Sequence, residues 1–212
     1  MPNDHYYTSA PTSAHKTAFV EVAYRGHSLH FETDRGVFSR TELDRGTEVL
    51  LDALPETVSG RVLDMGCGWG VIGVAVGKHW PDAVITMADI NQRACGLSRK
   101  NAQLNGVQAE VVESDGYEKV LGRAFDLILQ NPPIRAGKAV IYQMFADASS
   151  CLAENGELWL VIRKQQGAPS AISYLKTLFE KVETPEKKSG FWIIRCQKPL
   201  KNSNQNTEDE QA

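Results

Sequence analysis

The sequence predicts an α/β fold: a doubly wound, seven-stranded, mainly parallel sheet with antiparallel strands at its C-terminal end. Two observations support this prediction. From residue 60 onward, short β-favouring runs alternate with helical patterns of about a dozen residues, as in successive βαβ units. The apolar pattern then finishes, within residues 181–198, as two strands joined only by a turn.

Ahead of the sheet, residues 29–39 predict an extended entry with a turn at residues 34–36. Residues 40–55 predict a helix, because leucines recur there at helical spacing and Pro55 ends the pattern. Residues 60–68 then predict a short strand that runs into a glycine-rich loop.

The elements after this loop follow one another without long interruptions. Residues 71–80 are apolar nearly all round, which predicts a buried helix. A strand at 83–90 precedes a helix at 91–106, which Asn105-Gly106 closes. The remaining expected elements are strands at 109–115 and 125–131, a helix at 138–153, a strand at 156–164 and a helix at 168–180.

A single domain is expected, since 212 residues suffice for one full core and leave room only for a small second one. We expect this domain to span residues 18–200, between a disordered N-terminus (1–17) and a disordered acidic tail (201–212). No apolar run approaches the roughly 18 residues of a membrane span, and the N-terminus lacks the apolar core of a signal peptide. The expectation is a soluble cytoplasmic protein without a membrane partner.

The four cysteines, Cys67, Cys95, Cys151 and Cys196, are far apart in the sequence. They form no C-x-x-C pair, and no histidine stands near them at the spacing of metal ligands. Free thiols are therefore expected, with neither a metal site nor a disulfide framework.

The loop after the first strand of the sheet reads "VLDMGCGWGVIG". Gly68, Gly70 and Gly73 match the dinucleotide pattern G-x-G-x-x-G, and Asp89 stands about where an acid would bind a ribose. Asp64 argues against a dinucleotide, because a carboxylate at the mouth of the strand would repel a pyrophosphate. A cofactor with a cationic amino group and no phosphate suits Asp64 better.

Acids and glycines at the ends of the first three strands resemble the cofactor-binding motifs of class I S-adenosyl-L-methionine-dependent methyltransferases, which have a Rossmann-like sheet. The resemblance implies that Asp89 holds the ribose and that Asp115 and Gly116 lie beside the adenine. The cofactor-binding set that it implies is Asp64, Gly66, Cys67, Gly68, Asp89, Ile90, Asp115, Gly116, Asn131 and Phe38. From the residues alone, the alternatives are that Asp115 is a helix N-cap or a turn residue and that Cys67 serves only in packing.

The fourth strand of the sheet is expected to end at Asn131-Pro132-Pro133, because two prolines cannot donate to a sheet and hold the preceding residues extended. Ligands of open α/β sheets bind beyond the carboxyl ends of the strands. The Asn131 side-chain oxygen and the Pro132 carbonyl would there accept both N–H bonds of a planar amino group. This would orient the nitrogen toward a methyl donor and favour the charge it acquires, with no evident general base. The alternative is a rigid turn that merely ends the strand.

This tripeptide looks like the signature of methyltransferases that act on amino groups conjugated to a π-system. Residues 36–55 and 125–138 are similar to the small-domain family of bacterial ribosomal RNA guanine-N2 methyltransferases, which modify the small subunit, and the likeness covers about residues 29–198. It implies guanine N2 of 16S ribosomal RNA as the target. The catalytic residues that it implies are Asn131, Pro132 and Pro133, and the substrate-binding residues are Asn131, Ile134, Arg135 and Lys138.

Ile134 departs from the wider class, in which an aromatic residue often follows N-P-P and stacks on the base. Stacking would then fall to Phe38, Phe191, Trp192 or a guanidinium face.

Charge placement bears on the partner more than the net charge of −3, which would be zero without the three acids of the tail. Basic residues gather in segments predicted to lie at the edge of the sheet that holds the site, where they could neutralise phosphates, although Lys and Arg are common in loops in any case. They are Arg35, Arg40, Arg45, Arg135, Lys138, Arg163, Lys164, Lys187 and Lys188.

The expected partner is ribosomal RNA or the small ribosomal subunit, with a flipped or unpaired guanine as the target. A monomer is favoured, although the oligomeric state stays open. Other targets remain, namely adenine N6 or a protein glutamine amide, and so does a non-catalytic RNA-binding module. The presence of Asp64, Asp89 and Asn131 argues against such a module.

Overall fold

The structure is a computed structural model that describes residues 17–34, 37 and 42–200. Predictions for Phe38, Arg35, Arg40 and the two ends of the chain fall outside these residues. No helix in the described part is long and apolar enough to cross a membrane.

The main sheet has seven strands in the order β5-β4-β3-β6-β7-β9-β8. Strands β3 to β7 are parallel, and β8 and β9 are antiparallel at one edge, which confirms the predicted sheet. Chain order reverses between β3 and β6, the kind of switch point at which ligands bind. The strands are β3 (Gly60–Met65), β4 (Ala83–Asp89), β5 (Ala109–Glu113), β6 (Phe125–Gln130), β7 (Leu152–Arg163), β8 (Phe179–Lys188) and β9 (Phe191–Pro199).

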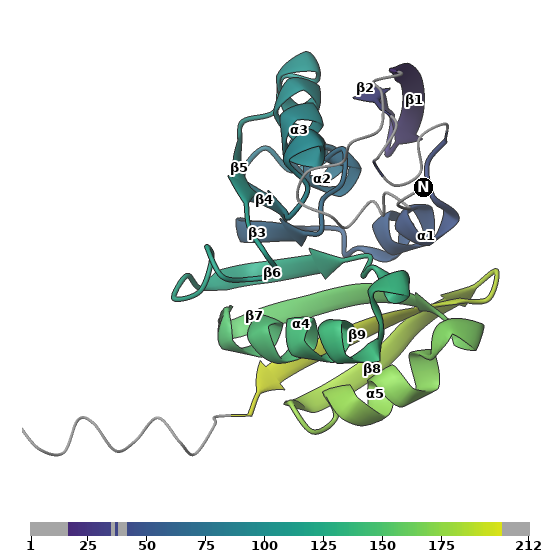
Figure 1. Cartoon of the computed structure of the whole chain (residues 1–212), viewed down its shortest axis with the longest axis vertical. Helices are drawn as coiled ribbons and strands as arrows, with labels where there is room; N and C mark the ends of the chain where they lie inside the picture. The colour runs from purple at the N-terminus through teal and green to yellow at the C-terminus, as the bar shows by residue number, and fades with distance from the viewer. Residues whose placement is uncertain (1–16, 35–36, 38–41, 201–212) are drawn as a thin grey trace, which may run out of the picture.

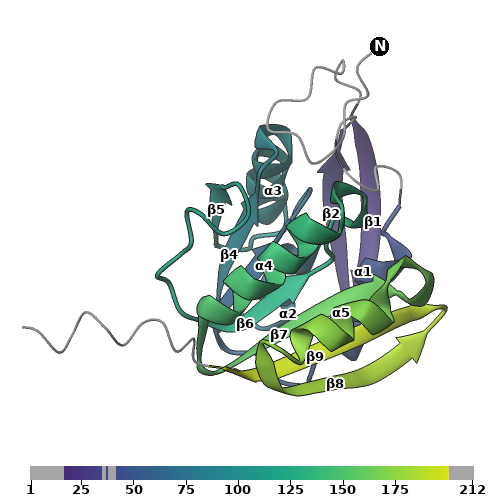
Figure 2. The ribbon, with the colours of Figure 1, turned by 60° about the horizontal axis from the view of Figure 1, so that its bottom comes forward.

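Helices cover both faces of this sheet, and the sheet divides the hydrophobic core into two layers (Figure 1). Alternate residues of each buried strand face opposite layers: Val62 packs with α1, α2 and α3, whereas Leu63 packs with α4 and α5. Figure 2 shows α4 and α5 side by side over β6, β7 and β9. The helices are α1 (Arg45–Ala53), α2 (Val71–His79), α3 (Gln92–Leu104), α4 (Lys138–Ser150) and α5 (Ala168–Leu175).

A two-stranded antiparallel hairpin precedes the sheet and remains separate from it: β1 (Ala18–Tyr24) and β2 (His27–Thr33). The expected extended entry at 29–39 covers only part of β2, and β1 was not predicted. The signal was present, because Val20, Val22 and Tyr24 alternate with exposed residues at the period of a strand.

Helix α3 lies beside this hairpin (Figure 1), and two asparagines, one in α3 and one capping its C-terminal end, attach the hairpin to the main fold. Asn105 accepts from the His30 backbone N–H (3.0 Å) and donates to the His30 carbonyl (2.8 Å). Asn101 makes the same pair of bonds to the Glu32 backbone, at 2.8 and 2.9 Å. The four-residue spacing of the two asparagines thus matches the two-residue spacing of their partners along β2. Their side-chain amides make the hydrogen bonds that a neighbouring strand would otherwise make.

Element ends differ from the predictions where a local interaction decides them. Helix α1 begins at Arg45 rather than 40, because the Asp44 side chain accepts from the Thr47 N–H and caps it. Helix α5 ends at Leu175 rather than 180, since β8 begins at Phe179.

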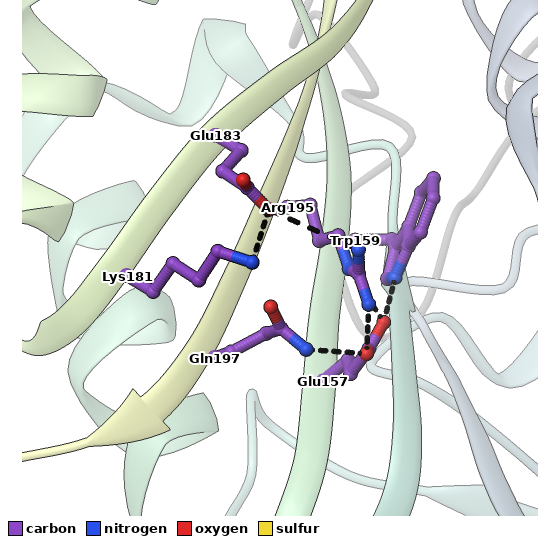
Figure 3. A network of polar contacts seen from close by, with 6 residues as sticks. All are labelled: Glu157, Trp159, Lys181, Glu183, Arg195 and Gln197. Atoms are coloured by element: carbon purple, nitrogen blue, oxygen red, sulfur yellow. Dashed lines mark hydrogen bonds and ion pairs between the residues drawn. The ribbon is translucent and has the colours of Figure 1, made fainter.

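A polar network holds the antiparallel edge in register (Figure 3). The Glu157 carboxylate accepts from the Arg195 guanidinium, from Gln197 (2.6 Å) and from Trp159 (2.7 Å). Burial alone would raise the pKa of Glu157, but the bonds from Arg195 and Trp159 lower it below its usual value. A hollow of about 280 Å³ adjoins Glu157 and Arg195 where β3 and β6 begin, at the edge opposite the predicted site.

Candidate active site

Asp64 lies near the carboxyl end of β3, fully buried at 1% exposure. Its Oδ2 accepts from the Gly73 N–H (2.9 Å) in the first turn of α2, whose N-cap residue Gly70 has no side chain to do so. Its Oδ1 is buried and has no partner among the described residues. Burial raises the pKa of Asp64 to about 7, and the nearby Asp89 adds to this rise. Among the described residues, no cation forms an ion pair with this buried acid.

The glycine loop turns sharply between β3 and α2. Gly66 and Gly68 have left-handed φ angles of 75° and 56°, and the Gly66 N–H donates to the Ala88 carbonyl of β4 (2.8 Å). A Cβ on Gly66, Gly68 or Gly116 would meet no other atom of the described residues within 4 Å. Open space therefore lies beside these backbones at the end of the sheet where Asp64 lies.

Asp89 ends β4 and faces the same loop. One carboxylate oxygen accepts from the Gly68 N–H and the other from the Asn91 N–H, each at 2.8 Å. Burial raises the pKa of Asp89 despite these backbone bonds. Two carboxylate oxygens offer about four acceptor positions, so the group retains capacity for further hydroxyl donors. Ile90, the next residue, is half-buried.

The segment after β5 reaches the same edge. The Ser114 N–H donates to the Asp89 carbonyl (2.9 Å), which brings Asp115 and Gly116 beside the end of β4. Asp115 is exposed and Gly116 half-buried. Tyr117 then anchors the segment, because its buried hydroxyl accepts from Gln130 Nε2 (2.5 Å) at the end of β6.

Asn131 follows β6 and is held from α1. Its Nδ2 donates to Asp44 Oδ2 and to Thr47 Oγ1, each at 2.9 Å. Its Oδ1 accepts no hydrogen bond from the described residues. Strand β6 ends at Gln130, one residue before the predicted end at Asn131, and Pro132 is buried and Pro133 half-buried. The amide oxygen of Asn131 is thus available as an acceptor at the carboxyl edge.

The residues after N-P-P lie on a short 3₁₀ turn, Ile134–Ala136. Ile134 packs against the α4 side of the core, Arg135 is exposed, and the Lys138 ammonium lies 5.0 Å from the Tyr142 ring centroid. Of the predicted stacking residues, Phe191 is buried beneath the Arg163 guanidinium, 4.6 Å from its ring centroid.

Trp192 is half-buried and lies under the Lys187 ammonium, 4.1 Å from its ring centroid. The exposed Arg163 guanidinium, supported on Phe191, is one described residue that offers the guanidinium face expected from the sequence.

The arrangement of two acids and an asparagine at the ends of β3, β4 and β6 agrees with the sequence comparisons. A family model, the methyltransferase small domain, matches residues 28–195. The chain belongs to this family. The methyltransferase is also 41% identical to the uncharacterized protein YbxB of Bacillus subtilis, over 92% of this chain and 99% of that one.

Other relatives of the methyltransferase are larger proteins. Ribosomal RNA small subunit methyltransferase C of Pasteurella multocida is 42% identical over 59% of this chain and 39% of its own length. A solved 16S rRNA N2 methyltransferase of T. thermophilus (RsmC), in complex with AdoMet and guanosine, superposes with a TM-score of 0.78 at 24% identity. That match covers 89% of this chain and 52% of RsmC, so the methyltransferase spans about half the length of such relatives or less.

The cofactor of the family is S-adenosyl-L-methionine, and the site of this methyltransferase fits it. The unpartnered, buried Asp64 Oδ1 suits a cationic amino group, and the open space at Gly66 and Gly68 admits a ligand close to the backbone. The Cys67 side chain is directed toward α3, where its Sγ lies 3.4 Å from Ser98 Oγ. Burial there raises the pKa of Cys67 well above its usual value.

Sequence reasoning missed the partners of the predicted residues. Asp44 and Thr47 hold Asn131, and Tyr117 holds Gln130. A signal existed for Asp44, because aspartate is a preferred N-cap and stands just before the periodic leucines of α1. No local pattern indicates that Tyr117 and Gln130 meet, because they come from different segments.

Proposed function

We propose that this methyltransferase transfers a methyl group from S-adenosyl-L-methionine to the N2 amine of a guanine in small-subunit ribosomal RNA. The observation that carries the proposal is the orientation of Asn131, whose amide nitrogen is engaged and whose oxygen is free to accept from a target amine. The names of the relatives, and the guanosine in the RsmC structure, support the choice of base and RNA.

In this proposal the cofactor is held by residues from three strand ends. Asp64 would take its amino group, Asp89 its ribose hydroxyls, and the Asp115-Gly116 segment would flank its adenine. The backbone at Gly66 and Gly68 would approach it closely. Once bound, the cofactor supplies an electrophilic methyl on a sulfonium.

The residues of this chain would then do the positioning. Asn131 Oδ1 and the Pro132 carbonyl accept the two N–H bonds of the target amine and direct its nitrogen toward the methyl. Because both are acceptors, they favour the positive charge that the nitrogen gains as it attacks. The S–C bond of the sulfonium breaks, a neutral thioether leaves, and the methylated nitrogen releases one of its protons to water. A guanine inside a duplex cannot reach this edge, so a flipped or unpaired base is the substrate.

Exposed cations near the site would hold the RNA backbone. Arg135 and Lys138 follow N-P-P directly, while Arg163 and Lys188 end β7 and β8 beyond it. Binding should therefore weaken steeply as the salt concentration rises.

The test uses labelled S-adenosyl-L-methionine with naked 16S RNA, isolated small subunits or a protein extract, followed by mass spectrometry of the product. Label on guanine N2 supports the proposal. Label on adenine N6, or on protein only, overturns the choice of substrate, and the absence of label in all three arms favours a binding module.

Two substitutions separate the roles of the site residues. Asn131→Ala should leave cofactor affinity nearly intact and lower kcat by about 100-fold or more, as loss of a transition-state acceptor does. Asp89→Ala should weaken cofactor binding first. Equilibrium binding of the cofactor and single-turnover rates measure the two effects, and the reverse pattern would contradict the assignment.

A further inference from the structure

Asn131 is oriented by two residues of a distant helix. Its Nδ2 donates to Asp44 Oδ2 (2.9 Å) and to Thr47 Oγ1 (2.9 Å), and both acceptors belong to the N-terminal end of α1. A carboxylate has no hydrogen to donate, so the nitrogen of the Asn131 amide must be the atom that faces Asp44. The amide oxygen is thereby turned away from α1.

We propose that Asp44 and Thr47 are positioning residues, which fix the Asn131 amide and polarise it for the target amine. This rests on the proposed function of Asn131. Two acceptors on one NH₂ group use both of its hydrogens, so a rotated amide, with its oxygen toward Asp44, would place acceptor against acceptor. The pair therefore selects one of the two amide orientations.

The charge of Asp44 contributes beyond orientation. Asp44 is half-buried, and no cation of the described residues lies within ion-pair distance to neutralise its field. An amide that donates to a carboxylate carries more negative charge on its oxygen, because hydrogen bonds in a chain polarise one another. Asn131 Oδ1 thus becomes a stronger acceptor for a nitrogen that turns positive.

The position of Asp44 is itself held from two sides. Its Oδ2 also accepts from the Thr47 N–H (3.1 Å) as the cap of α1. A Cβ on Gly46 would lie 2.9 Å from Asp44 Oδ2 and 2.9 Å from the Phe191 ring, so only glycine allows α1 to approach β9 this closely. The start of β9, the start of α1 and the residue after β6 therefore form one continuous contact.

Substitutions at Asp44 separate capping from positioning. Asp44→Ser keeps a good N-cap but is one atom too short to reach Asn131, so kcat should fall by about 10- to 100-fold while stability and cofactor affinity change little. Asp44→Asn keeps a neutral acceptor and should give a smaller fall. Thr47→Val should lower kcat, and Thr47→Ser should restore it. The exposed Asp82→Ser is the matched control.

A double-substitution cycle tests whether the effect passes through Asn131. In an Asn131→Ala protein, Asp44→Ser should cause no further loss of kcat, since the group that it positions is gone. An equal loss in both backgrounds would show that Asp44 acts on structure alone and would overturn the proposal.

A measurement without substrate keeps this inference separate from the identity of the target. The two side-chain N–H signals of Asn131 in a ¹⁵N-correlated NMR spectrum, assigned by their absence in Asn131→Ala, should shift in Asp44→Ser and exchange faster with solvent. Unchanged signals would overturn the proposal even if the protein methylates guanine. Shifted signals in a protein inactive on every RNA would refute only the proposed function.

Discussion

Replacing Asp64 by asparagine should abolish a pH dependence of stability that the fold of this methyltransferase imposes. An aspartate has an ordinary pKa of 3.8, whereas burial raises that of Asp64 to about 7 in the folded protein. Between about pH 4 and pH 7 the unfolded chain has therefore lost a proton that the folded chain still holds. Stability consequently falls as pH rises through this window, by about 1.4 kcal/mol per pH unit and on the order of 4 kcal/mol in all.

Asparagine is neutral throughout and keeps an oxygen for the Gly73 N–H. At pH 4, where Asp64 is largely protonated in the folded state, the variant and the unsubstituted protein should be equally stable within about 1 kcal/mol. At pH 8, without cofactor, the variant should lead by on the order of 4 kcal/mol.

Urea denaturation followed by circular dichroism at pH 4, 6 and 8 measures this difference, with the exposed Asp82→Asn as the control carboxylate. Identical pH dependence for Asp64→Asn and the unsubstituted protein would refute the reasoning. Cofactor binding gives a second readout, because a cationic amino group requires the ionised carboxylate. Affinity should rise with pH up to about 7 and be low and flat in the variant.

Two further substitutions, one where the hairpin is attached and one beside the site, are tested by urea denaturation. Asn105→Ala leaves the His30 backbone without its partner amide and should lower the free energy of unfolding by about 2–4 kcal/mol. The control Gln103→Ala, at an exposed position of α3, should change it by less than about 0.5 kcal/mol. Equal losses in the two variants would contradict the role of Asn105. Tyr117→Phe removes the acceptor of the buried Gln130 amide and should cost about 1–3 kcal/mol, and an unchanged midpoint would show that Gln130 finds another partner.

Much of the fold was readable because its signals are local. Strands with a two-residue period, helices with a 3.6-residue period and the breaks at Gly66 and Pro132 are properties of short segments. Because the carboxyl ends of parallel strands share one edge of the sheet, the sequence also predicts that Asp64, Asp89 and Asn131 lie near one another. The structure places all three at that edge.

Strand β1 was not predicted because local signals alone do not establish a short strand. Residues 18–24 alternate as a strand should, yet a single short alternation has no partner to confirm it. Its partner is β2, and the pair is stabilised against α3 through Asn101 and Asn105, which lie about 70 residues later.

Orientation and protonation at the site depended on tertiary contacts. Asn131 is visible in the sequence, but the direction of its amide is set by Asp44, 87 residues earlier. Asp64 is likewise visible, but its raised pKa arises from burial beneath α2 and from Asp89. Hydrogen bonds act over about 3 Å and desolvation depends on all surrounding atoms, so neither property belongs to a segment until the chain has folded.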